Sequence, residues 1–433
     1  MKQKRKGSIS VFLVILFACF LLVTAVLIAA ARSASGHSVT DAALRLAGRS
    51  VLSEYDKRLF SDYGLLAFQG DEKQIEADIT YYAGATLTPK KAPYLFLQNN
   101  GGHTVTPWPQ MSSVTANLKG FSLLDLNIFQ AQIEQASAAA WIEDLRTERR
   151  TRNSGDRKDD ENRTLRNQSV LDSLPSAGYD SPFFPSIAGV ADLPDGGNVA
   201  LESGAQFLVS QYILAVFSDH QSGSRDRDKH FFHNEVEYVL AGKDSDEGNY
   251  SDVLWKLRGI RYALNAEAIA VDSEKMQTLN DISNAAGPYK GVAIAAMLAT
   301  WAGAETHNDM MRLEGGGKVA LLKTKDQWAL NDPAEIFGSL GGAIASGVGE
   351  LVGYEYGETA VAPADSGGWD YEGYLKFLLI LLDRETKLVR VMDLIQINLK
   401  GTYNEDFLLR GYYTGFRYEW TADGDTYAYT ERY

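Results

Sequence analysis

An uncharged apolar stretch near the N-terminus constrains this chain more than any other feature. Residues 1–7 carry four cations, and residues 8–31 carry no charge at all. As a helix, residues 8–31 would be roughly 36 Å long, whereas crossing a bilayer core takes about 20 apolar residues. The stretch is therefore predicted to span a membrane, and the positive-inside rule places residues 1–7 in the cytoplasm.

Three other interpretations of this stretch stay open. A cleaved signal peptide would end near the small residues 29–31, although the apolar part of such a signal is only about 7–15 residues long. A lipoprotein would carry its lipid on Cys19, yet uncharged, mostly apolar residues follow that cysteine. A pilin-like signal would be cut at Gly7, but Phe12 stands where such subunits carry a glutamate. We therefore expect a retained membrane anchor.

Apolar residues near helical spacing continue beyond the membrane stretch. They predict a nearly continuous helix from Ser8 to about Ser61, with Gly36 as the candidate position of a kink and a stop at Gly64. The predicted order of parts is a cytoplasmic basic tail at 1–7, a transmembrane helix at 8–31, a stalk helix at 32–64, a first exported α+β part at 65–145, a charged flexible linker at 146–185 and a main exported α+β domain at 186–433.

The predicted fold class is α+β and dominated by helices. Residues 123–145, 204–218 and 291–305 are expected to be helices, as are 371–382 and 387–399. Another predicted helix has its apolar face at Val253, Leu257, Ile260 and Leu264. Strands are expected at 93–98 (PYLFLQ), 235–242 (EVEYVLAG) and 318–324 (KVALLKT), and alternation on both sides of Asp423-Gly424 predicts a C-terminal β-hairpin.

Charge and cysteine content exclude several classes of function. The net charge is −14 over 433 residues, and the part beyond residue 31 is more negative still, because the basic tail is removed from the sum. Such a surface does not suit nucleic acid as a partner. Cys19 is the only cysteine, so thiolate catalysis, disulfides and Cys-based zinc sites are excluded beyond the apolar stretch.

Candidate chemistry is sparse. On a strand, His233, Glu235 and Glu237 would share one face, near His230, and could approach a metal ion. A polar strand face beside water explains the same pattern more simply, and His307 with Asp309 is a weaker candidate. No HExxH, GxSxG or Walker A motif is present. We therefore predict no enzyme, and assign no catalytic, cofactor-binding or metal-binding residue and no cofactor.

Two compositional features have alternative interpretations. Small residues recur at three- or four-residue spacing in a Gly-rich segment, at Gly338, Gly342, Ser346, Gly349 and Gly353. They would form a close-packing helix stripe or, as we prefer, a flexible insertion. Seven tyrosines fall between Tyr403 and Tyr433. They would form an exposed adhesive face or, more simply, cross-strand pairs of the hairpin.

Several segments together resemble one family. In order, they are GSISVFLVILF, SEYDKRLFSDYGLLAF, EVEYVLAGKDSDEGN, LRGIRYALN, WAGAE with GGKVALLKTKDQW, and YEGYLKFLLILL with RVMDLIQINL. They resemble an uncharacterised, membrane-anchored family of Gram-positive bacteria that is associated with clusters for tight-adherence (Flp-type) pili. The resemblance implies a role in the envelope or in pilus assembly, beside pseudopilin-like subunits. It implies no catalytic residue.

Three functional hypotheses follow. The first is a single-span envelope protein with a structural or assembly role, accessory to a tight-adherence pilus or secretion machine. Its expected partners are the membrane and pilus or pseudopilin-like subunits, and its oligomeric state is left open. The second is a surface adhesin or ligand-binding module, suggested by the acidic, Tyr-rich exterior. The third, less favoured, is an envelope hydrolase that uses carboxylates or the His230 region.

Overall fold

The computed structural model describes residues 8–87, 111–138, 163–166, 168–178, 199–222, 230–330, 367–422 and 425–433. Helices dominate and a few antiparallel strands accompany them, which confirms the predicted helix-dominated α+β class. The chain forms two compact units. Unit 1 takes residues 1–129 and 409–433, and unit 2 takes residues 130–408. In sequence, unit 2 is therefore inserted into unit 1.

The N-terminal helix of unit 1 is long but shorter than we expected. Helix α1 (Ser8–Leu52) runs unbroken through Gly36, and it ends nine residues before Ser61. The break has a local cause, because the carboxylate of Asp56 accepts hydrogen bonds from the backbone N–H groups of residues 58 and 59 and so begins a new helix, α2 (Lys57–Tyr63). Gly64 ends α2 at φ 68°, a left-handed conformation that favours glycine, as the sequence predicted.

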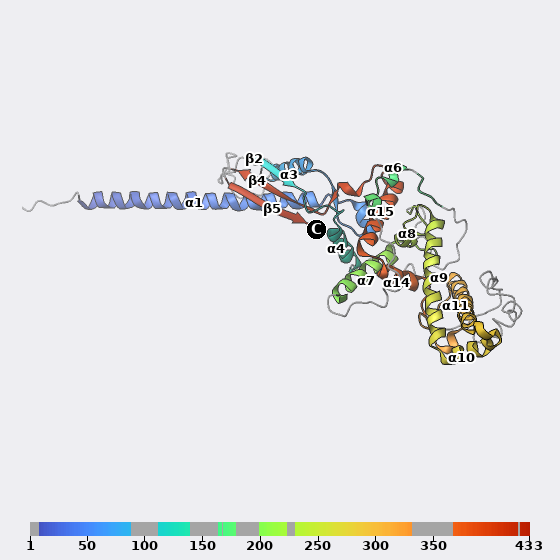
Figure 1. Ribbon diagram of the computed structural model, residues 1–433. Coiled ribbons are helices and arrows are strands. Elements are labelled where there is room, and N and C mark those ends of the chain that lie inside the picture. Colours follow the sequence, from blue (N-terminus) through green and yellow to red (C-terminus); the bar gives the residue numbers. More distant parts are fainter. Residues whose placement is uncertain are drawn as a thin grey trace, which may run out of the picture. The chain divides into compact units, whose positions relative to one another are not determined.

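A small antiparallel sheet covers the second half of α1 (Figure 1). Among the described residues, β2 (Met111–Asn117), β4 (Gly415–Ala422) and β5 (Asp425–Arg432) pair in that order. Ala422 lies opposite Asp425, so the predicted hairpin around residues 423–424 is confirmed. Helix α3 (Glu72–Leu87) packs beside α1 and β2, and β1 (Phe68–Gln69) pairs with β3 (Tyr412–Tyr413), which follows the short turn η7 (Leu409–Gly411).

This arrangement changes the predicted domain boundaries. We expected residues 186–433 to form one domain, but residues 409–433 pack in unit 1 with the N-terminal helix. The physical reason is the apolar side of the hairpin, where Phe416, Tyr418 and Trp420 join Leu44 and Val51 in one core cluster.

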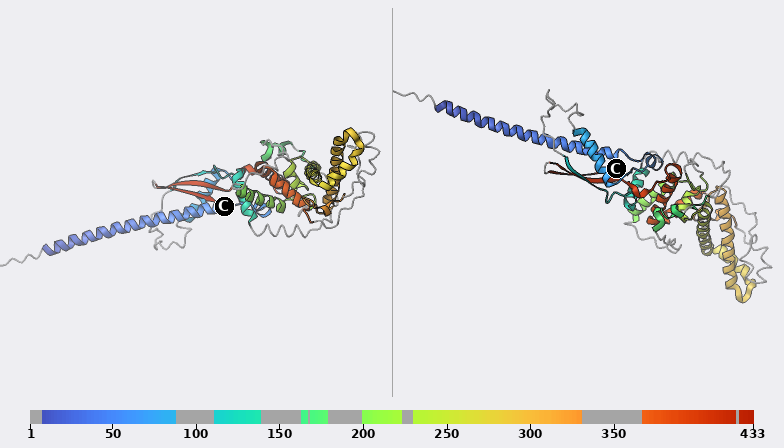
Figure 2. Two further views of the ribbon diagram at one scale, coloured as in Figure 1. Left: turned by 60° about the horizontal axis from the view of Figure 1, so that its bottom comes forward. Right: turned by 90° about the horizontal axis from the view of Figure 1, so that it is seen from above.

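Unit 2 contains an antiparallel pair of long helices, α9 (Asp246–Val271) and α11 (Lys290–Glu314). Helix α10 (Ser273–Ile282) and the turn η4 (Ser283–Tyr289) connect them at one end (Figure 2). The other elements of unit 2 are α4 (Leu126–Ser137, which begins in unit 1), α6 (Gln168–Leu171), η1 (Pro175–Gly178), α7 (Val199–Val216), α8 (Glu235–Ala241), η5 (Lys325–Gln327), α14 (Tyr371–Leu381) and α15 (Arg384–Thr402).

Part of the predicted linker 146–185 is folded into unit 2. Thr164 pairs with Ser245 in an isolated bridge, and Leu165 is buried. The backbone N–H of Ser176 donates to Asp393. The sequence did not predict this packing, because charged residues dominate the run 146–167. Its one apolar residue, Leu165, is the residue that is buried. The rest of that segment lies outside the described residues.

Two of the three single strands that we predicted can be compared with the structure. Residues 235–241 form helix α8, and this prediction was wrong. Six consecutive residues of α8, from Glu235 to Leu240, are buried, so no exposed face gives the helix its usual period in the sequence. In 318–324, only Val319 pairs, with Trp369, in an isolated bridge. The predicted strand 93–98 and the Gly-rich segment 337–353 lie outside the described residues.

Candidate functional site

Helix α1 has two halves in different surroundings. From Val11 to Ile28 its large apolar side chains are exposed, typically by more than half. By length and composition, α1 is the one helix among the described residues that could cross a membrane, as an anchor or as a signal sequence. The second half carries a buried stripe at Gly36, Thr40, Ala43, Leu44, Ala47, Gly48 and Val51. One continuous helix therefore joins an apolar exposed segment to the core of unit 1.

Close packing in the second half depends on a glycine. A Cβ atom added at Gly48 would lie 2.7 Å from the hydroxyl oxygen of Tyr418 and 2.8 Å from Cγ of Glu431. The sequence suggested only that Gly48 weakens the helix. The structure gives it a role, because the missing side chain lets the hairpin approach the backbone of α1.

Tyrosines of the hairpin bind α1 by their hydroxyl groups. Tyr418 donates to the carbonyl of Leu44 at 2.8 Å, and Tyr429 donates to Asp41 at 2.7 Å. The hydroxyl of Tyr433 donates to the carbonyl of Leu52. Burial raises the pKa of Tyr418, Tyr429 and Tyr433 well above the ordinary value, so these hydroxyls remain protonated donors.

This geometry partly revises both interpretations of the Tyr-rich C-terminus. Tyr418 does pair across the strands with Tyr429, their rings stacked 5.1 Å apart. Both rings nevertheless lie in the core against α1, and Tyr418 is 1% exposed. The tyrosines of β4 and β5 that suggested an adhesive surface are therefore largely used inside unit 1.

The His230 region does not form the metal site that we considered. Because α8 is a helix, its glutamates point to different partners. Nδ1 of His230 lies 2.8 Å from Glu235, which also accepts hydrogen bonds from Ser218 and Asn398. Glu237 instead accepts from the backbone N–H of His220. Within the part of the chain that the structure describes, no three His, Cys, Asp or Glu side chains are grouped to hold a metal ion.

Glu237 is the most perturbed carboxyl group of this region. It is fully buried, and one of its oxygens accepts hydrogen bonds from the hydroxyl of Tyr371 and from His220 N–H, while Oε2 has no hydrogen-bond partner among the described residues. Burial, together with the nearby Asp219, raises its pKa to about 8. Glu237 is therefore a neutral acid at pH 7. No described cavity leads to it, so we assign it no catalytic role.

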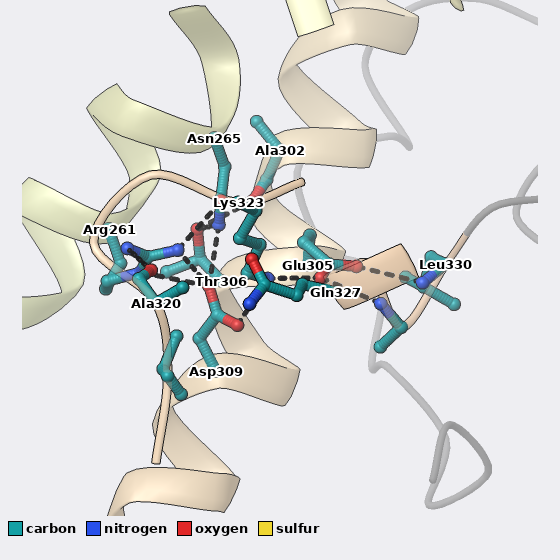
Figure 3. A network of polar contacts seen from close by, with 12 residues as sticks. Arg261, Asn265, Ala302, Glu305, Thr306, Asp309, Ala320, Lys323, Gln327 and Leu330 are labelled. Atoms are coloured by element: carbon teal, nitrogen blue, oxygen red, sulfur yellow. Dashed lines mark hydrogen bonds and ion pairs between the residues drawn. The ribbon is translucent and has the colours of Figure 1, made fainter. Parts of the chain in front are cut away.

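A second buried polar network joins α9 to α11 (Figure 3). Arg261 donates through Nε and Nη2 to one oxygen of Asp309, at 3.0 and 2.9 Å. Its Nη1 donates to the carbonyls of Ala320 and Leu321. Asn265 donates to the same oxygen of Asp309 at 2.9 Å. The guanidinium is fully buried and its donors are satisfied, which is what a buried ion pair requires.

Lys323 extends this network toward residue 330. Its ammonium lies 2.5 Å from the second oxygen of Asp309 and also contacts Glu305. Glu305 accepts the backbone N–H groups of Ala329 and Leu330, at 3.0 Å each. The positive charges of Arg261 and Lys323 are thus balanced by the negative charges of Asp309 and Glu305. The network has no described opening to solvent and acts as a clamp that fixes residues 318–330 on the helix pair.

The sequence interpretation missed the centre of this clamp. It placed Ile260 and Leu264 on the buried face of α9, whereas the buried residues recur every four positions, at Val253, Leu257, Arg261, Asn265 and Ile269. A strict four-residue spacing was the available signal, but a search for apolar residues passes over an arginine and an asparagine. His307, the weaker metal candidate, lies half-buried on α11 between two residues of the clamp.

The clamp and the α8 region lie within the part of the chain that a family model matches, residues 154–424, and this match covers more than half of the chain. The chain belongs to DUF5702, a family of unknown function. The DUF5702 match takes in the described parts of unit 2 from residue 163 onward and strand β4, and it leaves out α1. Comparison with curated proteins and with solved structures gives no match.

Proposed function

We propose that this protein is a single-span envelope protein with a structural or assembly role, accessory to a tight-adherence pilus or a related secretion machine. Residues 1–7 lie in the cytoplasm, residues 8–31 cross the membrane, and the rest of unit 1 and all of unit 2 lie outside. The observation that carries the proposal is the continuity of α1, whose apolar half leads without a break into the buried stripe that supports the hairpin.

A rigid connection of this kind suits an assembly role. Since α1 is both the anchor and a core element of unit 1, the unit is held at a fixed height above the membrane rather than on a loose tether. A pilin-like mechanism needs such a stem to present a head beside pilus subunits. The polar groups of the clamp and of α8 are used within unit 2, which favours a structural role over the hydrolase hypothesis.

The stem is tested with two neighbouring leucines that differ in environment. Leu44 is fully buried, whereas Leu46 is 54% exposed. Leu44→Asp should destabilise unit 1 and reduce pilus assembly in the native host. Leu46→Asp makes the same chemical change on the open side of α1 and should leave both unchanged. A Leu44→Asp protein that melts like the wild type and supports assembly would show that the stem is a passive tether.

Topology is tested separately. Protease added to intact, wall-stripped cells should digest the two units and leave a membrane-held N-terminal fragment. Protection of the units, while an external control protein is digested, contradicts the proposed orientation. Release of the intact units into the medium would instead support a cleaved signal.

A further inference from the structure

The sheet of unit 1 has an open face that the assembly role does not use. Side chains alternate along β4, so Tyr418 and Trp420 face the core while Arg417 and Glu419 are exposed. In the pairing of β2 with β4, Thr115 lies opposite Glu419 and Asn117 lies opposite Arg417. The described exposed positions of this face carry no large apolar side chain. A polar platform therefore faces away from α1.

This platform is hollowed. A depression of about 670 Å³ lies over β2 and β4 and is lined by Thr115, Asn117, Lys119, Arg417 and Glu419, with Ala116 and Tyr418 completing the lining. The volume falls within the range of roughly 300–1,000 Å³ that is common for ligand sites. Its hydroxyl, amide and charged groups suit a ligand rich in hydrogen-bonding groups rather than an apolar one.

Cations are concentrated at this depression, against the overall charge of the chain. Lys119 and Arg417 line it. Arg432 is exposed on the neighbouring strand β5, where it lies opposite Gly415, two residues before Arg417. The described residues provide no ion pair for any of these three cations. Glu419 is the one carboxylate in the lining, in a chain whose net charge is −14. The carboxylates of Glu76 and Glu72 lie nearby, because they accept hydrogen bonds from the backbone N–H groups of Ala116 and Leu118. The lining itself carries two cations and one carboxylate, which favours an anionic ligand there.

Arg417 is also held in place. Its guanidinium lies 5.9 Å from the centre of the Phe121 ring, a distance at which a cation is attracted to the face of an aromatic ring. Phe121 is buried and packs over Gly415, where an added Cβ atom would lie 2.9 Å from the ring. A fixed arginine loses less side-chain freedom when it binds a ligand.

We propose that this depression binds an anionic, hydroxyl-rich polymer, namely a polyol chain linked by phosphate groups. Lys119 and Arg417 contact the phosphates, while Thr115 and Asn117 form hydrogen bonds with the polyol hydroxyls. Arginine and lysine are both established phosphate ligands, and exposed hydroxyl and amide groups can replace water on a polyol. An acidic polypeptide would also match these cations, so polyglutamate serves as the comparison ligand that distinguishes it.

The test uses the full-length protein in non-ionic detergent and isothermal titration calorimetry. The probe is poly(glycerol phosphate), with uncharged polyglycerol and polyglutamate as comparison ligands. Lys119→Gln combined with Arg417→Gln should weaken binding of the probe by about tenfold or more, since two charged contacts are lost. Lys57→Gln combined with Lys73→Gln removes two other exposed cations of unit 1 and should change affinity less than about twofold.

A third variant separates shape from charge. Thr115→Trp fills the depression without altering a charge, and it should weaken binding of the probe even if the double variant at residues 119 and 417 fails to fold. Higher ionic strength should weaken binding, because exposed charges are screened over about 8 Å at 0.15 M salt. Absence of binding, equal binding of polyglutamate or of polyglycerol, or equal loss in the Lys57 and Lys73 variant would each overturn the proposal. None of these outcomes bears on the assembly role.

Discussion

The hydroxyl of Tyr418 donates a 2.8 Å hydrogen bond to the backbone carbonyl of Leu44, across 374 positions of sequence. Neither partner can reach water, because Tyr418 is 1% exposed and Leu44 is fully buried. The contact fixes the register of the hairpin along α1 and explains why the residue four positions after Leu44 has no side chain. Five predictions follow from this and the other contacts.

Removing the hydroxyl of Tyr418 should weaken unit 1 without disturbing its shape. Tyr418→Phe is expected to lower the free energy of unfolding by about 0.5–1.5 kcal/mol, the usual net value of one hydrogen bond. Urea unfolding of the detergent-solubilised protein measures the change. Tyr81→Phe is the control, because Tyr81 is 68% exposed on α3, and its loss should be close to zero.

Two glycines should respond in opposite directions to the same substitution. Gly84→Ala in α3 should raise the free energy of unfolding by about 0.5–1 kcal/mol, since nothing lies within 4 Å of the added Cβ and alanine favours helix. Gly48→Ala should lower it, because the new Cβ would lie 2.7 Å from the hydroxyl oxygen of Tyr418. If both variants are stabilised, the hairpin does not approach α1 this closely.

The buried ion pair of the clamp should be far more sensitive than an exposed one. Asp309→Asn leaves Arg261 and Lys323 without their shared carboxylate, and we expect a loss of about 3–5 kcal/mol. Glu314→Gln breaks the exposed pair with Arg258, whose charged atoms are 3.7 Å apart, and should cost about 0–1 kcal/mol. Similar small losses in both variants would contradict a buried clamp. Thermal melts followed by circular dichroism compare the two.

The buried acid Glu237 should make stability depend on pH. Its pKa is raised from 4.5 to about 8 in the folded protein, so the folded state holds the proton more tightly than the unfolded state. The stability that it contributes is therefore present below pH 4.5 and is lost as the pH rises toward 8, at no more than about 1.4 kcal/mol per pH unit.

Glu237→Gln should abolish this contribution while keeping the hydrogen bonds from Tyr371 and His220. Unfolding free energies measured from pH 5 to pH 8 should fall more steeply for the wild type than for the variant. The exposed Glu385→Gln serves as a control that keeps the wild-type pH dependence. Parallel curves for the wild type and Glu237→Gln would show that Glu237 titrates normally.

The apolar segment 8–31, which we propose crosses the membrane, should tolerate loss of its cysteine but not added charge. Arginine at Val14 and Leu22 should each cost about 2.5–3.5 kcal/mol near the centre of the bilayer and prevent stable insertion. Cys19→Ala should remain in the membrane fraction after carbonate extraction. Its release would support a lipid anchor instead.

How well the sequence predicted the fold depended on the burial pattern of each element. Helices α11, α14 and α15 were predicted because apolar residues dominate long stretches of their sequences, such as 291–305 and 377–382. The hairpin was predicted because alternation and a turn dipeptide coincide at residues 423–424. Helix α8 was mistaken for a strand because all its sides are buried, and Glu235 is satisfied by a partner far away in sequence, Asn398.

The candidate sites were harder to predict for a similar reason. The metal hypothesis grouped His233 with two glutamates by strand spacing, and a helix sends those side chains to separate partners. Arg261 and Asn265 were missed because a charged or amide side chain in a helix normally marks the solvent side. Only three-dimensional contacts reveal that both face Asp309. The cation-lined depression likewise depends on the pairing of strands more than 290 residues apart.

The interrupted layout of unit 1 has a consequence for biosynthesis. Helix α1 leaves the ribosome first and α3 can pack beside it early, but the hairpin side of its buried stripe is covered only when residues 415–432 have been made. During that interval unit 2, which lies wholly between these segments in sequence, is free to fold by itself. Closing such a long loop adds only a slowly growing entropic cost, so the delay is set mainly by translation. A chain that stalls before the hairpin would leave Leu44 and Val51 only partly covered, with apolar surface of the unit 1 core open to solvent.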